Sequence, residues 1–530
     1  MKVATIVFEI LSAGLAILTY LLVLRYNLHM LQLHGYKNDE QMNWLSEHPG
    51  KQALLYVSVP ILLCTILFMN LPCFIVLTLY LWICVKYFGY LRIANTKKKL
   101  VFTMRVRRLV VTALFLAVLL LAGLYILGWK LTGMGLRFLV GGVLILFVMA
   151  PLWTLFANVV NKPIEKGVNN HYINDAKRIL KQNKDLQIIG ITGSYGKTSV
   201  KFYLETLLKE RFRTLVTPES YNTPMGVVKT IRGSLKPTHE IFVCEMGARH
   251  VGDIKEITDI VHPHHGLITS VGPQHLETFG GIENVAATKF ELADALPKGG
   301  LLFLNGDNEW ITEKAKNYEA PIFYRNDSEG AGYRASDISL SSLGTEFTVT
   351  TPDGQQESFR TRLIGGHNVI NIVGAISVAH TLGIPLKDLK VPVRRIQSVP
   401  HRMELKDHGN MTIIDDAFNS NPVGSKAAVE TLKLFEGVRI LITPGMVELG
   451  EQEEEYNYKF GTYAAACCDY ILLVGINRTK PIMQGALDSG FAEEKCQAFR
   501  KLEEAMQFAH SISDAGHKYI LLENDLPDCY

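Results

Sequence analysis

The sequence has few cysteines and none in a metal-binding arrangement. Its 530 residues include eight cysteines, which are scattered, with Cys467 and Cys468 adjacent and no C-x-x-C pair. This spacing excludes a zinc ribbon and a disulfide framework, so reduced cytosolic thiols are expected. A charge excess is also missing, because 54 Lys and Arg against 51 Asp and Glu leave a net charge of +3. We therefore expect no nucleic-acid partner. Internal repeats and low-complexity tracts are absent as well.

Hydrophobic residues, in contrast, are abundant in the first third of the chain. The mean hydropathy of +0.14 is unusual for a soluble enzyme. Each of five apolar stretches approaches the roughly 20 residues that a membrane-spanning helix needs. A cleavable signal peptide is not expected, since no small-residue site follows the first stretch and more stretches come after it. The five stretches are residues 4–24, 53–69, 73–85, 109–127 and 138–160, of which the short second and third could instead form one re-entrant hairpin.

A basic loop between the third and fourth stretches sets the predicted orientation. No acidic residue lies among its cations, and basic loops stay on the cytoplasmic side. Counting five spans from this loop places the N-terminus outside and everything after residue 160 inside. We therefore predict a multi-pass protein of the cell membrane with cytoplasmic catalytic domains and the lipid bilayer as a partner. The cations are Arg92, Lys97, Lys98, Lys99, Arg105, Arg107 and Arg108.

From about residue 161 the pattern becomes that of a soluble α/β protein. Apolar runs at 188–191, 241–243, 265–268 and 301–304 alternate with helical patterns, which predicts a mostly parallel sheet. Residues 333–363 are rich in Ser, Thr and Gly and predict antiparallel strands of the same domain. A second α/β unit begins near residue 398, with runs at 411–414, 439–442, 470–474 and 519–522. The predicted fold class is α/β: a multi-span helical membrane region (1–160), a P-loop parallel-sheet ATPase domain (161–397) and a C-terminal Rossmann-like domain (398–530).

The stretch IIGITGSYGKTS at 188–199 predicts a phosphate-binding loop between a strand and a helix. Gly193 and Gly196 allow backbone N–H groups to converge on phosphate oxygens, and the helix N-terminus adds partial positive charge. Lys197 would reach the outer phosphates, and the Thr198 hydroxyl would bind Mg²⁺. The full Walker spacing requires Gly at position 191, where Ile stands, so the loop is a shortened variant. A chance Gly-Lys-Thr is the alternative, and the flanking strand and helix argue against it.

Polar residues follow several of the predicted strands. Glu245 closes one strand, where ligands bind in open α/β sheets, and its carboxylate suits Mg²⁺. His275 follows a Gly-Pro turn after another strand, and Lys289 lies on a predicted helix. Taken alone, His275 and Lys289 are more often ordinary surface residues. Asn305 and Asp307 end a further strand.

These clusters, in this order, resemble the Mur ligase family. The resemblance covers roughly residues 186–530, and its last two motifs are most similar to the member that adds D-alanyl-D-alanine to UDP-N-acetylmuramoyl-tripeptide. Eight ordered motifs make it specific for the family and less specific for the substrate. Besides the nucleotide loop, the motifs are Glu245-Met246-Gly247, His275-Leu276-Glu277, Lys289-Phe290-Glu291, Asn305-Gly306-Asp307, Gly366-His367-Asn368-Val369 with Asn371, His401-Arg402-Met403-Glu404, Asp415 to Pro422, and Met446 to Gly450.

The resemblance implies roles for individual residues. Catalysis would depend on Lys197, His275 and Lys289, the last carrying a carbamate. Two Mg²⁺ ions would be held by Thr198, Glu245, His275 and the modified Lys289. Asn305 and Asn371 would lie near the adenine, Arg402 would reach the γ-phosphate and Asp416 the ribose. The ATP site would therefore comprise Gly193, Ser194, Gly196, Lys197, Thr198, Ser199, Asn305, Asn371, Arg402 and Asp416.

The reaction implied is formation of an amide bond driven by ATP. A carboxylate is a poor electrophile, so ATP converts it to an acyl phosphate, which an amine attacks with release of phosphate. Phosphate charge is present at every step, which requires cations, and closure of two domains would keep water away. The expected partners are a nucleotide, a cell-wall precursor carboxylate, and an amino acid or dipeptide amine.

Two departures from the family pattern affect the expected substrate. The family's soluble UDP-binding N-terminal domain has no counterpart, and apolar stretches take its place. The C-terminus reads LLENDLPD at 521–528, where the D-alanyl-D-alanine-adding enzymes have Lys-Gly-Ser; such an acidic stretch favours an amine or cationic group. Alternatives are a lipid-linked or polymer carboxylate as donor, poly-γ-glutamate-like or folate-type chemistry, an ATP-driven transporter, and an inactive scaffold. Few intramembrane charges argue against the transporter, and the complete phosphate-handling set argues against the scaffold.

Overall fold

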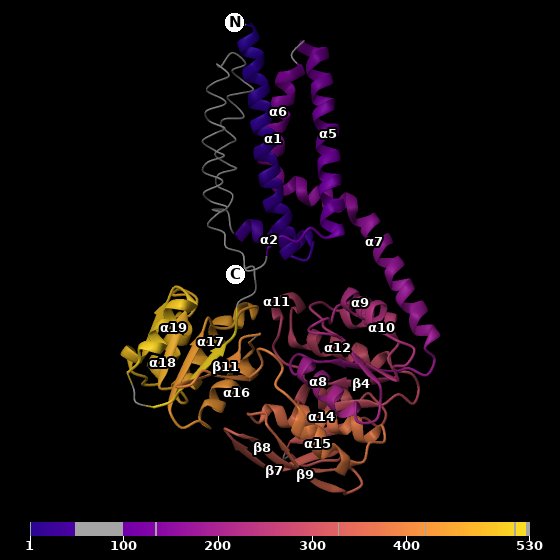
Figure 1. Ribbon diagram of the computed structural model, residues 1–530, viewed down its shortest axis with the longest axis vertical. Helices are drawn as coiled ribbons and strands as arrows, with labels where there is room; N and C mark the ends of the chain where they lie inside the picture. Colours follow the sequence, from indigo (N-terminus) through magenta and orange to yellow (C-terminus); the bar gives the residue numbers. More distant parts are fainter. Residues whose placement is uncertain are drawn as a thin grey trace. The chain divides into compact units, whose positions relative to one another are not determined.

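The chain divides into two compact units, each described here by itself. The computed structural model describes residues 2–47, 99–132, 135–326, 328–418, 420–513 and 516–525. One unit comprises residues 1–170 with 527–530, and the other comprises residues 171–526 (Figure 1). The predicted spans at 53–69 and 73–85 lie outside the described residues.

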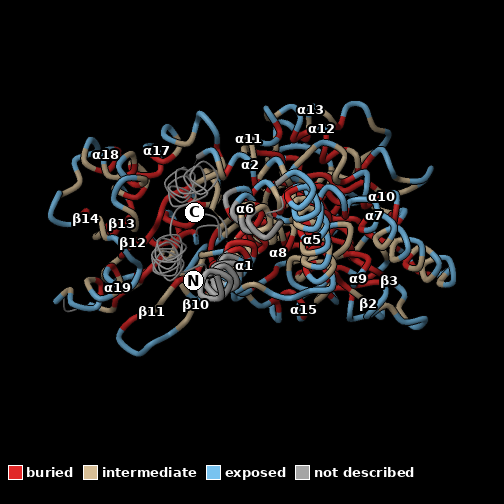
Figure 2. Tube along the Cα trace, turned by 90° about the horizontal axis from the view of Figure 1, so that it is seen from above, coloured by how far each residue is buried: buried red, intermediate tan, exposed pale blue. Residues whose placement is uncertain are grey.

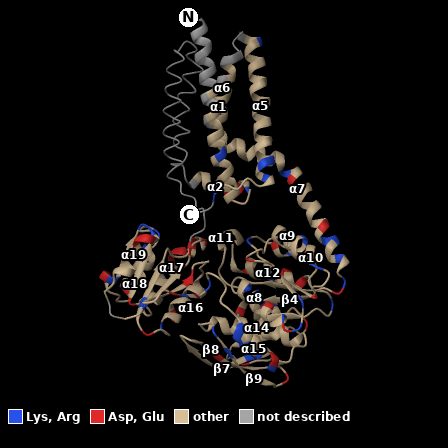
Figure 3. Ribbon diagram, viewed as in Figure 1, with Lys and Arg blue, Asp and Glu red and all other residues tan. Residues whose placement is uncertain are grey.

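The N-terminal unit is helical, as its apolar stretches predicted. Its buried side chains, among them Val23, Leu109, Val143 and Leu155, come from four helices that pack on one another. One face of helix α5 (Met104–Thr132) is exposed and apolar, with Phe115 61% and Val118 62% accessible. Few charges lie along this helix (Figures 2 and 3). The described helices are α1 (Lys2–Leu33), α2 (Asn38–Glu47), α5 (Met104–Thr132), α6 (Gly135–Val148) and α7 (Ala150–Gln182).

Within the described residues, one helix is long and apolar enough to cross a membrane, the segment Met104–Leu131 of α5. The predicted span at 138–160 is not one straight helix, because α6 and α7 are bent by 82° relative to each other. Pro151 follows this break and has no amide hydrogen to continue the hydrogen-bond ladder of α6. If the bent pair counts as one span, the described part of the chain holds two.

Three of the predicted loop cations belong to a helix instead. Arg105, Arg107 and Arg108 lie in the first turns of α5. Arg108 donates two hydrogen bonds to the buried carboxylate of Glu165 in α7, with distances of 2.7 and 2.8 Å. This bidentate pair ties the start of α5 to α7.

The second unit contains a nine-stranded sheet that is parallel from β2 to β7, followed by antiparallel β8 and β9. The predicted strands near 188, 241, 265 and 301 are confirmed, and the short strands β2 and β6 are additional. In spatial order the strands are β2 (Thr214–Val216), β3 (Ile241–Glu245), β1 (Gln187–Thr192), β4 (His265–Ile268), β5 (Leu302–Asn305), β6 (Ile322–Asn326), β7 (Tyr333–Ser341), β8 (Gly344–Thr350) and β9 (Gln356–Thr361).

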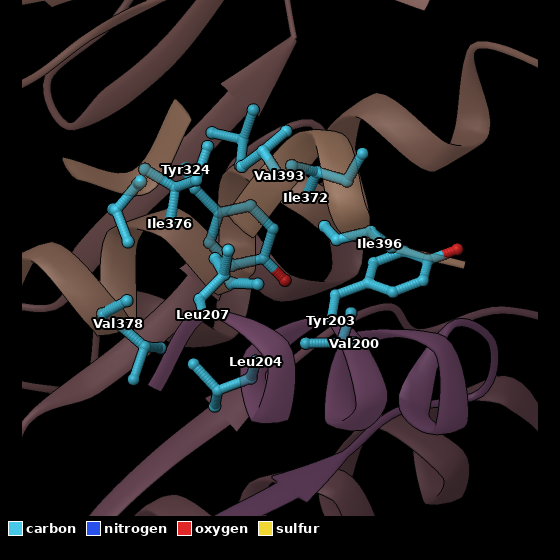
Figure 4. Packing of buried hydrophobic residues seen from close by; sticks show 14 of the residues in the cluster. Val200, Tyr203, Leu204, Leu207, Tyr324, Ile372, Ile376, Val378, Val393 and Ile396 are labelled. Carbon is cyan, nitrogen blue, oxygen red and sulfur yellow. The ribbon is translucent and has the colours of Figure 1, made fainter. Parts of the chain in front are cut away.

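Helices cover both faces of this sheet, which is why its strands read as continuous apolar runs. Ile189 and Ile191 of β1 lie in a core shared with helices α8 (Lys197–Leu208) and α14 (His367–Thr381). Ile188 lies in the core on the opposite face of the sheet. Figure 4 shows side chains of the first of these cores gathered around Tyr324. The helices are α8 (Lys197–Leu208), α9 (Pro224–Ser234), α10 (Asp253–Val261), α11 (Leu276–Phe279), α12 (Ile282–Asp294), α13 (Glu309–Ala315), α14 (His367–Thr381), η2 (Leu386–Leu389) and α15 (Lys390–Arg395).

A second, six-stranded sheet follows, as the sequence predicted. All its neighbouring strands pair in parallel except β10 with β11. Its strands in spatial order are β10 (Glu404–Asp407), β11 (Met411–Asp416), β15 (Lys518–Glu523), β12 (Val438–Thr443), β13 (Tyr470–Val474) and β14 (Cys496–Phe499), and its helices are α16 (Pro422–Leu432), η3 (Gly450–Gln452), α17 (Glu453–Ala465), α18 (Lys480–Asp488), η4 (Glu493–Lys495) and α19 (Leu502–Ser511).

Candidate active site

The glycine-rich loop joins the carboxyl end of β1 to the N-terminus of α8. Gly193 and Gly196 have φ angles of 148° and 78°, which L side chains rarely adopt. A Cβ at Gly196 would also lie 2.6 Å from the side-chain oxygen of Asn371, and one at Gly193 would strike Thr269. Only glycine fits at both positions, so the loop has the tight backbone that a phosphate cradle needs.

Lys197 folds back over this loop. Its Nζ donates to the carbonyl oxygens of Gly193 at 2.5 Å and Ser194 at 3.0 Å. Enclosure by the protein lowers the pKa of Lys197 to about 8; nearby Arg402 acts in the same direction and Glu245 opposes it. An anion that enters the loop, such as a phosphate group, would stabilise the protonated form of Lys197.

Glu245, at the end of β3, is buried in a set of donors. Thr198 Oγ1 lies 3.0 Å from its Oε1, Asn222 Nδ2 lies 3.1 Å from the same oxygen, and Lys201 Nζ lies 2.9 Å from its Oε2. Burial raises the pKa of Glu245, but Lys201 and Lys197 outweigh it and hold that pKa below its usual value. Glu245 is therefore an ionised carboxylate beside the loop hydroxyl, a donor set suited to Mg²⁺.

His275 is held by an acid from the second α/β domain. Its Nδ1 lies 2.6 Å from Oε2 of Glu448, which follows β12, and Arg249 lies 3.7 Å from the other carboxylate oxygen. Burial lowers the pKa of His275 and Glu448 opposes this shift. The Glu448 contact orients the ring, as a carboxylate partner does for a metal-binding imidazole.

Lys289 is almost completely buried on α12, with 2% of its surface exposed. Burial and the nearby charge of Lys197 hold its pKa well below the usual value, and Asp253 and Glu291 only partly offset them. This shift favours the neutral amine, which is the nucleophilic form of lysine.

Arg402 reaches this loop from the second α/β domain. Its Nη2 lies 3.4 Å from Thr198 Oγ1, and its guanidinium lies 4.4 Å from the ring centre of Phe418. Its buried Nε has no hydrogen-bond acceptor in the described part of the chain. A buried cationic donor without an acceptor is costly unless an anion fills the site, so Arg402 fits a phosphate here.

Four further predicted residues have mainly structural contacts. Asn305 ties two strand ends together, accepting from Asp307 N at 3.0 Å and donating to Thr269 O at 2.9 Å. The Ser194 hydroxyl donates to Gly272 O at 3.1 Å. Asn371 on α14 lies against Gly196, as described above, and Ser199 is buried in the first turn of α8. Their nucleotide contacts remain predictions.

The structure thus brings the predicted chemical residues together. Lys197 interacts electrostatically with Glu245, His275 and Lys289, and Asp416 joins the group through Arg402. Sequence reasoning gave no role to Lys201, Asn222 or Glu448. Lys201, one helical turn after Lys197, was detectable as a lysine on the apolar face of α8.

Comparison with known proteins identifies the family. A profile of the Mur ligase middle domain matches residues 191–379. A profile described as "Mur ligase, glutamate ligase domain" matches residues 401–522. The chain belongs to the Mur ligase family. Mur ligases use ATP and Mg²⁺, and membership places the chain among the ADP-forming amide ligases.

The relatives to which this Mur ligase is similar include MurF-type proteins. The UDP-N-acetylmuramoyl-tripeptide–D-alanyl-D-alanine ligase of Escherichia coli is 29% identical over 60% of this chain and 73% of that protein. The Bacillus subtilis protein of the same name is 30% identical over 53% of this chain and 60% of its own length. A crystal structure of MurF from Acinetobacter baumannii matches 68% of this chain and 78% of that one, with 25% identity and a TM-score of 0.62.

Proposed function

We propose that this Mur ligase is anchored in the cell membrane and joins an amine to a cell-wall precursor carboxylate through an acyl phosphate. The reaction most like it is addition of D-alanyl-D-alanine to UDP-N-acetylmuramoyl-tripeptide, the activity named for the relatives. The convergence of Lys197, Glu245 and Arg402 on one glycine loop carries the proposal. The proposal rests on similarity to part of the length of the relatives, since the chain spans 60% of the B. subtilis protein.

The residues have distinct parts in this reaction. Bound Mg²⁺–ATP would supply the phosphoryl group and neutralise its charge. Lys197 and Arg402 would hold phosphate oxygens from two sides, so that negative charge is stabilised as the carboxylate oxygen attacks the γ-phosphorus and ADP departs. Glu245, Thr198 and His275 offer oxygen and imidazole ligands for metal. The amine nitrogen then attacks the acyl carbon, and phosphate leaves with one oxygen of the original carboxylate.

Transfer of that oxygen tests the mechanism directly. The full chain in detergent is given ATP, D-alanyl-D-alanine and UDP-N-acetylmuramoyl-tripeptide labelled with ¹⁸O in its terminal carboxylate. We expect mass spectrometry to find one amide product per ADP and one ¹⁸O atom in each phosphate. Unlabelled phosphate would contradict the acyl phosphate, and ATP consumption without amide in the presence of a panel of amines would contradict the ligase.

A lipid-linked donor is the second candidate. The apolar helix Met104–Leu131 supports an anchor, and the matched domains begin only at residue 191. A donor held in the membrane would then be presented to a catalytic unit that lies on the cytoplasmic side. The same assay with a lipid-linked precursor decides between the donors. Recovery of the chain in the soluble fraction without detergent would contradict the anchor.

We further propose that Lys289 carries a carbamate that serves as an anionic metal ligand. Its neutral amine would attack CO₂, releasing a proton and leaving a carbamate beside Lys197. Because acid protonates the amine and drives the carbamate back to CO₂, the modification is expected to be lost as pH falls. NMR of protein equilibrated with ¹³C-bicarbonate should show a carbamate carbon that disappears in Lys289→Met. The same signal in that variant would assign the carbamate to another amine.

A further inference from the structure

Two carboxyl groups meet at the carboxyl ends of neighbouring strands in the second sheet. Asp416 ends β11 and Glu523 ends β15, and the two residues are paired in the parallel register. Their carboxyl groups lie within hydrogen-bonding reach of each other. Asp416 Oδ1 also accepts from Met403 N at 3.1 Å. The carboxyl ends of such strands are where open α/β sheets bind ligands.

Glu523 is the inner member of this pair. It is 1% exposed, and its Oε1 accepts from Ser420 Oγ at 2.6 Å. Its Oε2 has no hydrogen-bond donor within the described residues, where no cation pairs with it either. The adjoining Asn524 holds the surrounding loops, accepting from Ser420 N at 3.1 Å and donating to Gly445 O at 2.6 Å. The acidic stretch thus buries Glu523, while Asp525 is exposed.

A buried carboxylate without a cation is unfavourable, and two in contact are more so. Burial and the charge of Asp416 hold the pKa of Glu523 well above its usual range, and burial raises the pKa of Asp416 to about 6. The charged groups facing the pair are Arg402, which favours an ionised Asp416, and Asp415, which opposes it. A single proton on Glu523 resolves the contact, because Oε2 then becomes a donor and Asp416 its acceptor.

We propose that Glu523 is a positioning residue that acts as a neutral acid, donating from Oε2 to Asp416 and thereby holding the Asp416 carboxylate toward the nucleotide. This inference rests on the proposed function and on the ribose contact that the family resemblance implies for Asp416. Asp416 would then accept one hydrogen bond from Met403 N and one from Glu523, which together fix the orientation of its carboxylate. The remaining lone pairs of the carboxylate stay available for the ligand. Arg402 joins this carboxylate to the phosphate loop, since it faces Asp416 and contacts Thr198.

Nucleotide binding to the full chain in detergent tests the role of the proton. Dissociation constants of Mg²⁺–ADP and Mg²⁺–2′,3′-dideoxy-ADP are measured for wild type, Glu523→Gln and Glu523→Met. The amide of glutamine can donate as the protonated acid does, so Glu523→Gln should bind ADP within about threefold of wild type. Methionine keeps the volume without a donor, so Glu523→Met should bind ADP about 10- to 100-fold more weakly. The dideoxy nucleotide should bind all three alike.

The pH profile gives a second readout. Wild-type affinity for ADP should fall on the alkaline side, where Glu523 loses its proton. Glu523→Gln should decline less steeply, keeping only the contribution of Lys197. The exposed neighbour provides a matched control, since Asp525→Asn should behave as wild type.

Two binding outcomes would overturn the inference. If Glu523→Gln and Glu523→Met bind ADP equally weakly, the negative charge of Glu523 is needed, as it would be in a site for a cationic acceptor. Wild-type affinity in Glu523→Met would show that no positioning occurs. ADP binding requires neither the carboxylate substrate nor the amine. If the variants bind ADP as expected but the enzyme forms no amide, only the proposed function is contradicted.

Discussion

Replacing Lys197 with alanine is expected to lower kcat/KM for amide formation by about 100- to 1,000-fold. The variant loses the ammonium that lies over Gly193 and Ser194, so charge developing on the transferred phosphoryl group is left without this donor. The pKa of Lys197 near 8 adds a pH effect. Phosphate binding favours the ammonium, so wild-type affinity for ADP should weaken as pH rises above 8. Lys197→Ala should decline less steeply, keeping only the contribution of Glu523. Product formation and calorimetry measure the two effects.

Lys209 provides the matched control for this variant. It lies at the end of α8, where its Nζ forms an exposed ion pair with Glu205 at 2.6 Å. Lys209→Ala should retain wild-type kinetics, because exposed pairs contribute little. An activity of Lys197→Ala close to that of Lys209→Ala would refute the phosphate role of the loop.

The largest stability effect is expected at the buried pair of Lys201 and Glu245. Both side chains are at most 1% exposed, and removing one partner leaves an uncompensated charge in the core. Lys201→Met or Glu245→Gln should each lower the free energy of unfolding by about 3–5 kcal/mol. The double variant should recover part of that loss, because neither charge then remains, yet it should stay inactive without the carboxylate. Denaturant unfolding of the four proteins gives the coupling energy.

Additive losses in the double variant would show that the two side chains do not stabilise each other. Lys209→Met, which breaks an exposed pair on the same helix, should cost less than about 1 kcal/mol and so separates burial from charge. Mg²⁺ dependence should change in the Glu245 variant and persist in Lys209→Met. A Glu245→Gln enzyme with normal Mg²⁺ dependence would contradict a metal-binding role.

Local patterns predicted most of the second unit. The apolar runs at 188–191 and 411–414 are strands β1 and β11 because strands covered on both faces need continuous hydrophobic residues. Short strands such as β2 were missed, since three residues carry no periodic signal. The single span predicted at 138–160 was wrong as a straight helix, because Pro151 interrupts an otherwise uniform apolar run.

The nucleotide loop could be recognised from sequence because its chemistry lies within a few consecutive residues. Gly193, Gly196, Lys197 and Thr198 are neighbours along the chain, and their backbone requirements are local. Partners from distant segments could not be recognised in this way. Lys201 contacts Glu245, and His275 contacts Glu448 across 173 residues. Only the order of the strands brings these groups together.

The role of the acidic C-terminal stretch shows the same division. As a string of residues, Glu523 and Asp525 are equivalent acids. In the folded chain Glu523 is buried against Asp416, whereas Asp525 is exposed. Composition and periodicity determined that this chain has apolar helices, two α/β sheets and a phosphate loop, since those depend on neighbouring residues. Which charges are buried, paired or protonated was decided by tertiary packing, because solvent exclusion and contact depend on segments far apart in sequence.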